Sequence, residues 1–440
     1  MKRINSFVKK NIANFLSVFI ILQPILDSLT AICVNYLKIN ITLGAIVRLL
    51  FLLFLIYYFV FLDKSSSKKN KMFFLMSLFA YLVVFSILII IVKDYNALFY
   101  ELKNTINTFY LLIVFIIFLD MIEQYNIKIK IKTFVLTYII YLLLIIIPNI
   151  FHLGFLSYYH SKVGNVGWFL SANGVGNILC ILLPFIIYYL LKLCNNVFLK
   201  LLLILSTLYV FVSLGTKTPV LGLMICILSN VIYFFVMWIK QKKIKQIIIV
   251  SFLGLVILFS SIILFPKTSF YKNIQIHKNY LGFDSYLDVI TDYKLIDHFI
   301  FSQRLTFLEN TYNNYEKSTS AEKILGIGYI ENYGTDEVSI KTIEIDYFDI
   351  FFRNGIVGTC FFIFVFYKYI IKLKSNKKDK SNKKDKTSLI FVEYRTCIIL
   401  ILLLSLFSGH VLVAPPISFF VALIISILLK GGFYEENYKG

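Results

Sequence analysis

Long apolar runs, separated by clusters of Lys, Asn, Ser and Gly, recur along most of this 440-residue chain. A helix that crosses the hydrocarbon core of a bilayer needs about 20 predominantly apolar residues, and many of these runs are that long. The chain is 59% hydrophobic and 15% charged, whereas a soluble domain is about 45–50% apolar and about 25% charged. These features exclude a soluble enzyme and predict an all-α, polytopic integral membrane protein.

The spacing of the apolar runs predicts about twelve transmembrane helices. The N-terminal run continues to Ala31 without a small-residue cleavage pattern, which favours a first span over a removable signal peptide. Residues 93–107 carry apolar side chains at helical spacing among charged ones, and we expect a helix lying at the membrane interface there. The predicted spans are 12–31, 41–62, 72–92, 108–122, 133–151, 169–191, 197–214, 219–239, 246–265, 347–371, 390–409 and 414–430.

The charge distribution predicts how these spans are oriented. Lys and Arg total 44 against 24 Asp and Glu, a net charge of +20, yet the basic residues lie between apolar runs rather than on one folded face, which argues against nucleic-acid binding. Most of them fall in every second connection, as the positive-inside rule requires of cytoplasmic segments. We therefore expect a multi-pass protein of the cell membrane with both termini in the cytoplasm.

The same pattern divides the chain into three parts. Residues 1–265 contain the first nine spans, and residues 346–440 contain the last three. Between them, residues 266–345 form one large external loop, in which apolar residues at helical spacing predict a small folded cap. A Lys-rich segment at 372–388, which repeats the sequence SNKKDK, is expected to be a solvated cytoplasmic linker.

Ionisable residues inside spans are costly, so their positions point to function. In the predicted topology six of them lie at the outer ends of spans, whereas only Glu393 and Arg395 lie at the inner face. Simpler explanations remain open for some: Lys217 can snorkel to the surface, and His410 can be an exposed turn residue. The outer six are Asp27, Arg48, Lys217, Glu344, Asp346 and His410.

Other candidate motifs are weak. Asp349 and Arg353 are four residues apart and are expected to neutralise each other on one helix face. Gly326-Ile327-Gly328 is too short for a phosphate-binding fingerprint, so we interpret it as a loop turn. The six cysteines lack CxxC pairing or histidines at metal spacing, so neither disulfides nor a metal site is expected. The chain has no Walker sequence, which disfavours ATP-driven transport.

Several short motifs together resemble the O-antigen ligase and polymerase superfamily over nearly the whole chain. In that family a His usually stands 11 residues before the first Gly of a GxxG motif; here Glu344 occupies that position before Gly355 and Gly358. The segment from Gly167 to Asn173 resembles the Gly-x-Phe-x-x-x-Asn start of a middle span. Gly215-Thr216-Lys217 is similar to a site where many members carry Ser-Arg, and Arg304 with the following GxG resembles the family's external loop.

Three further segments resemble the Gram-positive capsule or teichuronic acid polymerase branch. They are Gln23-Pro24-Ile25-Leu26-Asp27, Gly44 with Arg48, and Gly409-His410-Val411-Leu412. The resemblance implies a GT-C-like membrane glycosyltransferase that acts outside the membrane on polyprenyl-diphosphate-linked oligosaccharides. It implies a glycan donor, a glycan acceptor, membrane lipid and other polysaccharide export proteins as partners, and no cofactor.

The resemblance also suggests roles for individual residues. Arg304 and Lys217 are expected to stabilise the departing diphosphate, with Arg48 adding positive charge. Glu344 is the candidate base that takes the proton of the acceptor hydroxyl, and Asp346 is its alternative. The substrate-binding candidates are Arg48, Asp27, His410 and Asn173. Three hypotheses remain: a polymerase that joins repeat units, a ligase that transfers the glycan to a terminal acceptor, and a transporter of lipid-linked sugar.

Overall fold

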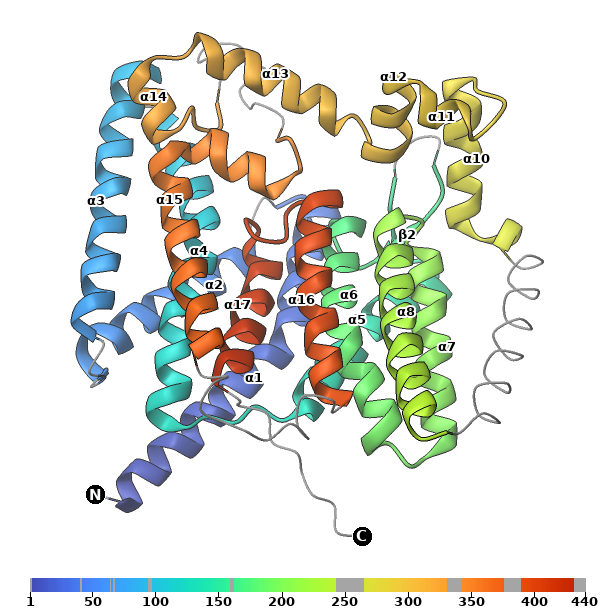
Figure 1. The fold of residues 1–440 in the computed structure, drawn as a ribbon, viewed down its shortest axis with the longest axis horizontal. Coiled ribbons are helices and arrows are strands. Elements are labelled where there is room, and N and C mark those ends of the chain that lie inside the picture. Colours follow the sequence, from blue (N-terminus) through green and yellow to red (C-terminus); the bar gives the residue numbers. More distant parts are fainter. Residues whose placement is uncertain are drawn as a thin grey trace.

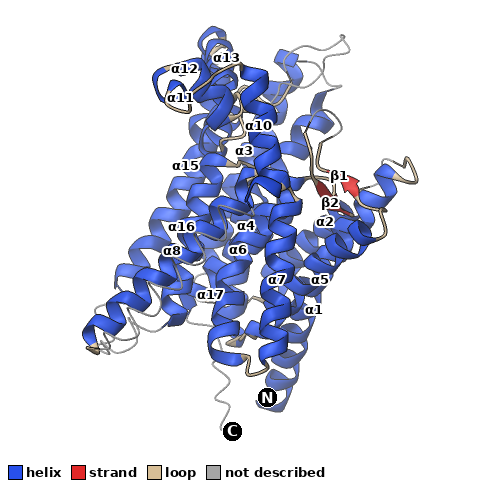
Figure 2. Ribbon diagram, turned by 90° about the vertical axis from the view of Figure 1, so that its right-hand side faces the viewer, coloured by secondary structure: helices blue, strands red, loops and turns tan. Residues whose placement is uncertain are grey.

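The computed structural model describes residues 2–39, 42–63, 65, 68–93, 97–158, 162–242, 265–330, 342–375 and 389–430. Long helices stand side by side in a bundle, and a group of shorter helices lies across one end of it (Figure 1). Helix α1 begins and α17 finishes at the opposite end of the bundle in both views (Figures 1 and 2). The molecule is therefore an all-α, polytopic membrane protein, as the sequence predicts.

Nine helices in the described part of the chain are long and apolar enough to span a membrane, and two apolar helices are shorter. Every predicted span except 246–265, which lies almost wholly outside the described residues, coincides with one of them. The helices are α1 (Lys2–Asn35), α2 (Leu43–Tyr57) with η1 (Tyr58–Leu62), α3 (Lys68–Lys93), α4 (Leu98–Tyr125), α5 (Ile131–Ile150), α6 (Ala172–Tyr188) with η3 (Tyr189–Leu193), α7 (Val197–Ser213), α8 (Lys217–Lys240), α15 (Asp346–Ser375), α16 (Leu389–Phe407) and α17 (Pro415–Lys430).

The prediction of a separate interfacial helix before the fourth span is wrong. Helix α4 runs without a break from Leu98 to Tyr125. The charged residues in its first turns do not indicate a position on the membrane surface. Glu101 is fully buried and contacts polar groups inside the protein. The carboxylate of Glu101 pairs with Lys93 at 3.0 Å and accepts the backbone N–H groups of Tyr329 and Ile330 at 2.8 and 2.9 Å.

Helices α4 and α17 form the centre of the bundle. Every residue of α4 from Thr108 to Ile122 is buried, as expected for a helix that is apolar on all sides. On the peripheral helix α3, by contrast, Phe73, Phe79 and Ile91 expose about 70% or more of their surface (76%, 68% and 76%). Exposed apolar side chains at this density are what a lipid-facing helix presents to the hydrocarbon core.

The segment predicted to form the cap is helical in its described part. It contains η4 (Phe265–Lys267), α10 (Ser269–Leu281), α11 (Asp288–Thr291), α12 (Tyr293–Leu295), η5 (Ile296–Phe301), α13 (Arg304–Lys317) and α14 (Ser320–Leu325). These helices lie over the end of the bundle where α8 begins (Figure 1). Below them, β1 (Phe155–Leu156) and β2 (Asn165–Gly167) form a short antiparallel hairpin in the connection between α5 and α6.

A break in α15 fixes the far end of the cap to the bundle. Gly355 interrupts the helix with φ 65° and ψ −169°. A Cβ atom there would lie 2.4 Å from the backbone nitrogen of Gly326 and 2.4 Å from the carbonyl oxygen of Ile324. The turn predicted at Gly326-Ile327-Gly328 therefore packs directly against this break, and only glycine fits both the conformation and the contact.

Candidate active site

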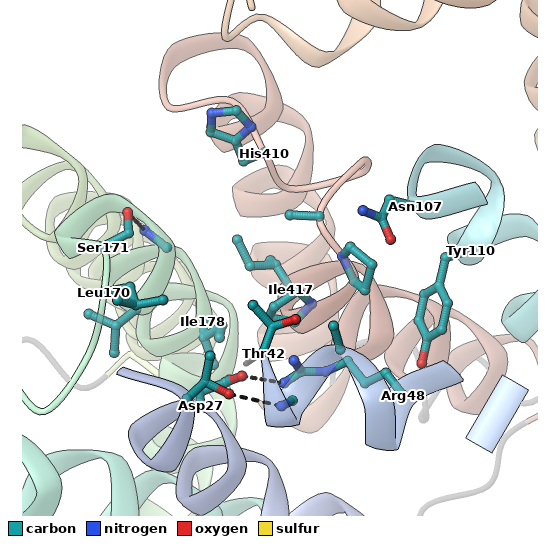
Figure 3. A pocket seen from close by; sticks show the side chains of 18 of the residues that line it. Asp27, Thr42, Arg48, Asn107, Tyr110, Leu170, Ser171, Ile178, His410 and Ile417 are labelled. Carbon is teal, nitrogen blue, oxygen red and sulfur yellow. Dashed lines mark hydrogen bonds and ion pairs between the residues drawn. The ribbon is translucent and has the colours of Figure 1, made fainter. Parts of the chain in front are cut away.

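The described residues line several cavities near the capped end of the bundle, and two of these contain most of the predicted site residues. The first, of about 520 Å³, lies between α1, α2, α4, α6 and the turn that joins α16 to α17. Figure 3 shows its labelled residues, with His410 at one end and Asp27 and Arg48 at the other. Aromatic side chains of Tyr110, Tyr141 and Phe169 contribute to its walls. The cavity is thus large enough for a small part of a glycan and is mostly apolar with polar groups at its two ends.

A buried ion pair closes one end of this first cavity. The guanidinium of Arg48 donates to Asp27 at 2.6 Å and to the side-chain oxygen of Gln23 at 2.9 Å. Tyr141 donates its hydroxyl to the second carboxylate oxygen of Asp27 at 3.4 Å. Gly44 belongs to this arrangement, because a Cβ atom there would lie 2.8 Å from the Arg48 guanidinium. The Gln23–Asp27 and Gly44–Arg48 motifs of the sequence therefore pack against each other through the Arg48 side chain.

The second cavity, of about 320 Å³, is lined by cations. It lies between the β1–β2 connection, the first turn of α8, the cap helices α10 and α13, and the C-terminal end of α16. Among the described residues that line it, none is Asp or Glu. Four bear a positive charge or can acquire one: Lys162, Lys217, His277 and Arg304. A cavity of this composition favours an anionic ligand.

The first turn of α8 faces this cavity. The residues from Gly215 to Thr218 are all in its lining, and α8 is a helix of 24 residues. Thr216 occupies the N-cap position, but its hydroxyl makes no capping hydrogen bond. This buried oxygen is among the polar atoms of the described residues that have no hydrogen-bond partner. A long helix therefore begins at the edge of a cation-lined space.

The cap positions the basic side chains around Phe299. Lys217 donates to the carbonyl of Phe299, and its ammonium lies 4.8 Å from the centre of the Phe299 ring. The ring of His277 packs against the same phenyl group in a tilted arrangement, with 5.5 Å between the ring centroids. Burial, together with the charges of Lys162 and Lys217, lowers the pKa of His277 to about 4. His277 is therefore neutral near pH 7 while the cavity is empty.

The position of the Arg304 side chain is set by helix α13, of which Arg304 is the first residue. The buried carboxylate of Asp297 accepts the backbone N–H groups of Leu305 and Thr306 at 2.8 and 3.0 Å, which fixes the start of α13. From there the guanidinium of Arg304 reaches the last carbonyls of α16, donating to Phe407 and, at 3.1 Å, to Ser408. A cation at a helix C-terminus is favoured by the helix dipole.

Glu344 lies between the two cavities. One carboxylate oxygen accepts a hydrogen bond from Arg304 at 3.0 Å, and the other lies 4.0 Å from Nε2 of His410. Arg304 lines the second cavity and His410 lines the first. The Glu344 side chain is 29% exposed, so solvent or a ligand reaches it. Glu344 lines neither cavity itself, but it adjoins one residue of each.

The backbone around Glu344 is held in an uncommon conformation. Glu344 and His410 have φ values of 61° and 59°, which few non-glycine residues adopt. Both oxygens of Asp349 accept backbone N–H groups there, from Ile343 at 3.0 Å and Glu344 at 2.9 Å. Asp349 also faces Arg353 at 4.0 Å, as its spacing predicts. Strained backbone held by its surroundings is frequent at functional sites.

Asp346 is only two residues away but has a different environment. It is fully buried, and its carboxylate accepts three backbone N–H groups, from His410 at 2.6 Å and from Val411 and Leu412 at 2.8 Å. These bonds fix the turn between α16 and α17. The acceptor capacity of this carboxylate is therefore used by the backbone, whereas Glu344 keeps an oxygen directed toward His410.

Six of the eight predicted site residues divide between the two cavities, whereas Glu344 and Asp346 line neither. Lys217, Arg304 and Asn173 line the second cavity, while Asp27, Arg48 and His410 line the first. Arg48 is thus placed with Asp27 and not beside Arg304. Sequence analysis missed Thr216, Lys162 and His277 as ligand candidates, because an isolated Thr, Lys or His belongs to no sequence motif. No group of three or more His, Cys, Asp or Glu residues that could hold a metal ion occurs among the described residues.

Fold and site together define a polytopic membrane protein with a cation-lined cavity and an adjacent carboxylate at the capped end of its helix bundle. A family model described as "O-antigen ligase like membrane protein" matches residues 9–283 and 291–431, and the chain belongs to this family. Membership indicates a membrane enzyme that transfers glycans. No curated protein and no solved structure matches the chain.

Proposed function

We propose that this protein is a polysaccharide polymerase that joins polyprenyl-diphosphate-linked oligosaccharide repeat units at the outer face of the cytoplasmic membrane. The family supplies the glycan-transfer chemistry. The resemblance of the Gln23–Asp27, Gly44–Arg48 and Gly409–Leu412 segments to Gram-positive capsule or teichuronic acid polymerases supports a polymerase rather than a ligase. Membrane lipid and other polysaccharide export proteins are the partners that belong to this proposal.

One observation carries the proposal: Glu344 lies between a cation-lined cavity and a second, more apolar cavity. Its carboxylate is 3.0 Å from Arg304 on one side and 4.0 Å from His410 on the other. A glycosyl transfer requires a negatively charged leaving group, a nucleophilic hydroxyl and a base beside that hydroxyl. The two cavities and the carboxylate between them match these three requirements.

In the reaction that we propose, the donor diphosphate binds among Arg304, Lys217 and their neighbours. A hydroxyl of the acceptor glycan, bound in the first cavity, attacks the anomeric carbon of the donor. The bond from that carbon to the diphosphate oxygen breaks, and its electron pair leaves with the polyprenyl diphosphate. The hydroxyl proton passes to Glu344, while Arg304 and Lys217 offset the charge that grows on the leaving group. The product glycan stays attached to the acceptor's lipid.

The first cavity has the groups that a sugar needs. Aromatic rings such as Tyr110 and Phe169 offer faces on which a pyranose can pack, and polar groups at the two ends can orient its hydroxyls. Asp27 and Arg48 neutralise each other, so this cavity has no excess charge to attract phosphate. We therefore assign the acceptor glycan to the first cavity and the donor diphosphate to the second, with Asn173 contacting the donor side.

The test is incubation of the purified protein in lipid nanodiscs with a polyprenyl-diphosphate-linked repeat unit, without ATP or added metal. We expect a ladder of longer lipid-linked glycans on a gel. A ligase would give transfer only after a terminal acceptor is added, and a transporter would leave the substrate unchanged. Either of these two results, with protein shown to be folded, would contradict the polymerase.

A further inference from the structure

The second cavity contains an unused set of hydrogen-bond donors that points to an oxyanion. The N-terminus of a helix favours negative charge, because its first amide groups lack partners within the helix. At the N-terminus of α8 the Thr216 side chain is 4% exposed, and its hydroxyl has no hydrogen-bond partner within the described residues. Nε of Arg304 is likewise buried and without a partner there. A buried hydroxyl at a helix N-terminus is well placed to donate to a phosphate oxygen.

His277, on α10, lines the same cavity as the N-terminus of α8. The charged and titratable groups that line this cavity and the adjoining one beneath the cap come from the connection between β1 and β2, from α8 and from the cap, whereas α6 and α16 contribute none. They are Tyr158 and Lys162 from the β1–β2 connection, Lys217 from α8, Tyr280 from α10, His298 from η5 and Arg304 from α13. No carboxylate is among the described residues that line either cavity. Apart from Glu344, which pairs with Arg304 at 3.0 Å from outside the lining, the described groups around His277 are neutral or positively charged, and a bound anion would be favoured.

We propose that the donor diphosphate binds between the N-terminus of α8 and His277, and that His277 takes up one proton as the diphosphate binds. Thr216 donates its hydroxyl to the same phosphate. This inference rests on the proposed function for the identity of the ligand, but it assigns new ligand groups and couples binding to pH.

The charges determine whether diphosphate binding is accompanied by uptake or release of a proton at His277. In the empty cavity burial and two lysines lower the pKa of His277 to about 4, so the imidazole is neutral at about pH 6. A bound diphosphate diester brings one negative charge on each phosphate and favours the imidazolium form. The bound state therefore holds more protons than the free state, and the affinity for diphosphate rises as pH falls.

The probe is geranyl methyl diphosphate, a diester with no sugar to transfer and no group of its own that titrates near neutral pH. Calorimetry with the full-length protein in nanodiscs, at about pH 6 in two buffers of different ionisation enthalpy, measures the protons taken up. At this pH the lysines remain charged with or without ligand. We expect uptake of close to one proton per bound diester and an affinity that rises by up to about tenfold per unit decrease in pH.

Three variants separate this assignment from the alternatives. At about pH 6 His277→Gln should bind the diester without proton uptake, and its affinity should not depend on pH over the range in which Lys217 and Lys162 stay charged. His298→Gln, on the neighbouring part of the cap, should keep the uptake. Thr216→Val preserves the side-chain shape and removes no capping bond; it should weaken binding by roughly tenfold or more, as expected for loss of a hydrogen bond to a charged group, while proton uptake persists.

Binding without proton uptake, or uptake that survives in His277→Gln, would overturn the role of His277. Unchanged affinity in Thr216→Val would overturn the position of the phosphate at α8. These measurements use a ligand that cannot react, so they are independent of turnover. A protein that binds the diester as described but forms no glycan ladder would contradict the polymerase and leave the diphosphate site in place.

Discussion

Two carboxylates that stand two residues apart have different environments in this protein. Glu344 is partly exposed between Arg304 and His410, whereas Asp346 is fully buried beneath the turn at His410–Leu412. The sequence places both at the outer start of a span, because each lies in a charged stretch before an apolar run. It cannot separate their roles, since burial and partners depend on where the distant α16–α17 turn lies.

Replacing Glu344 tests the assignment of the base. Glu344→Gln keeps the size of the side chain and removes its ability to accept a proton, so we expect kcat to fall by about a hundredfold or more. The midpoint of thermal unfolding should change little, because this carboxylate is partly exposed. Glu309→Gln, on the exposed face of α13, is the matched control and should keep full activity. Near-normal turnover by Glu344→Gln in the ladder assay would exclude this residue as the base.

Replacing Asp346 should give a different result. Asparagine has one acceptor oxygen in place of two and no charge, so Asp346→Asn weakens the three bonds to the α16–α17 turn. Each hydrogen bond to a charged group contributes about 1.5–3 kcal/mol, and we expect a clear decrease in the thermal midpoint measured by tryptophan fluorescence. If this variant unfolded like the parent protein and lost only turnover, Asp346 would have a chemical role.

At the scale of secondary structure, hydropathy predicts where helices lie much better than how they end. The apolar runs correspond closely to α1–α8 and α15–α17. The prediction was wrong at residues 98–107, because Glu101 and its charged neighbours resemble an interface. The partners of Glu101 are Lys93, at the end of the preceding helix, and the backbone at Tyr329 and Ile330, which is far away in sequence. Buried ion pairs make a helix end polar in sequence although it is internal in the fold.

The break of α15 at Gly355 gives an element-scale prediction. Gly355→Ala places a Cβ atom 2.4 Å from two backbone atoms of the α14–Gly326 segment and in a conformation with φ 65°. We expect displacement of this segment, a lower thermal midpoint and weaker activity. Gly282→Ala is the control, because it has a similar φ of 68° but nothing within 4 Å of the added methyl group. It should cost only the left-handed strain, about 1–2 kcal/mol.

Equal midpoints for the Gly355 and Gly282 variants would contradict the packing argument. Hydrogen exchange of the segment from Ser320 to Ile330 provides a second measurement. We expect faster exchange there in Gly355→Ala than in Gly282→Ala, because the contact between this segment and α15 is lost only in the first variant.

At the scale of the whole molecule, the cap and the outer ends of the spans are on one side. The positive-inside pattern predicts that this side is external. Ser285→Cys in the cap should react with a membrane-impermeant maleimide on intact cells, whereas Gln241→Cys, just after α8, should react only after permeabilisation. The parent protein, measured in parallel, gives the contribution of its six native cysteines. The reverse labelling pattern would invert the topology and exclude an external reaction.

The sequence therefore predicts the class of fold and the side of the membrane on which the polar residues gather. It does not predict that they divide between two cavities. That division depends on side chains such as Arg48, which turns to Asp27 on α1, and His277, which is brought over α8 by the cap. Contacts of this kind join segments more than 20 residues apart and leave no local pattern.

The two cavities share a wall, made by the start of α6 at Ser171–Gly174 and by the turn from Phe407 to His410. This arrangement limits how the protein can escape an inhibitor. If a compound fills one cavity and contacts this wall, substitutions in the wall that weaken its binding also change the shape of the other cavity. Such substitutions would alter the cavity that the inhibitor leaves open as well as the one that it fills, so the wall is the preferred point of contact for an inhibitor.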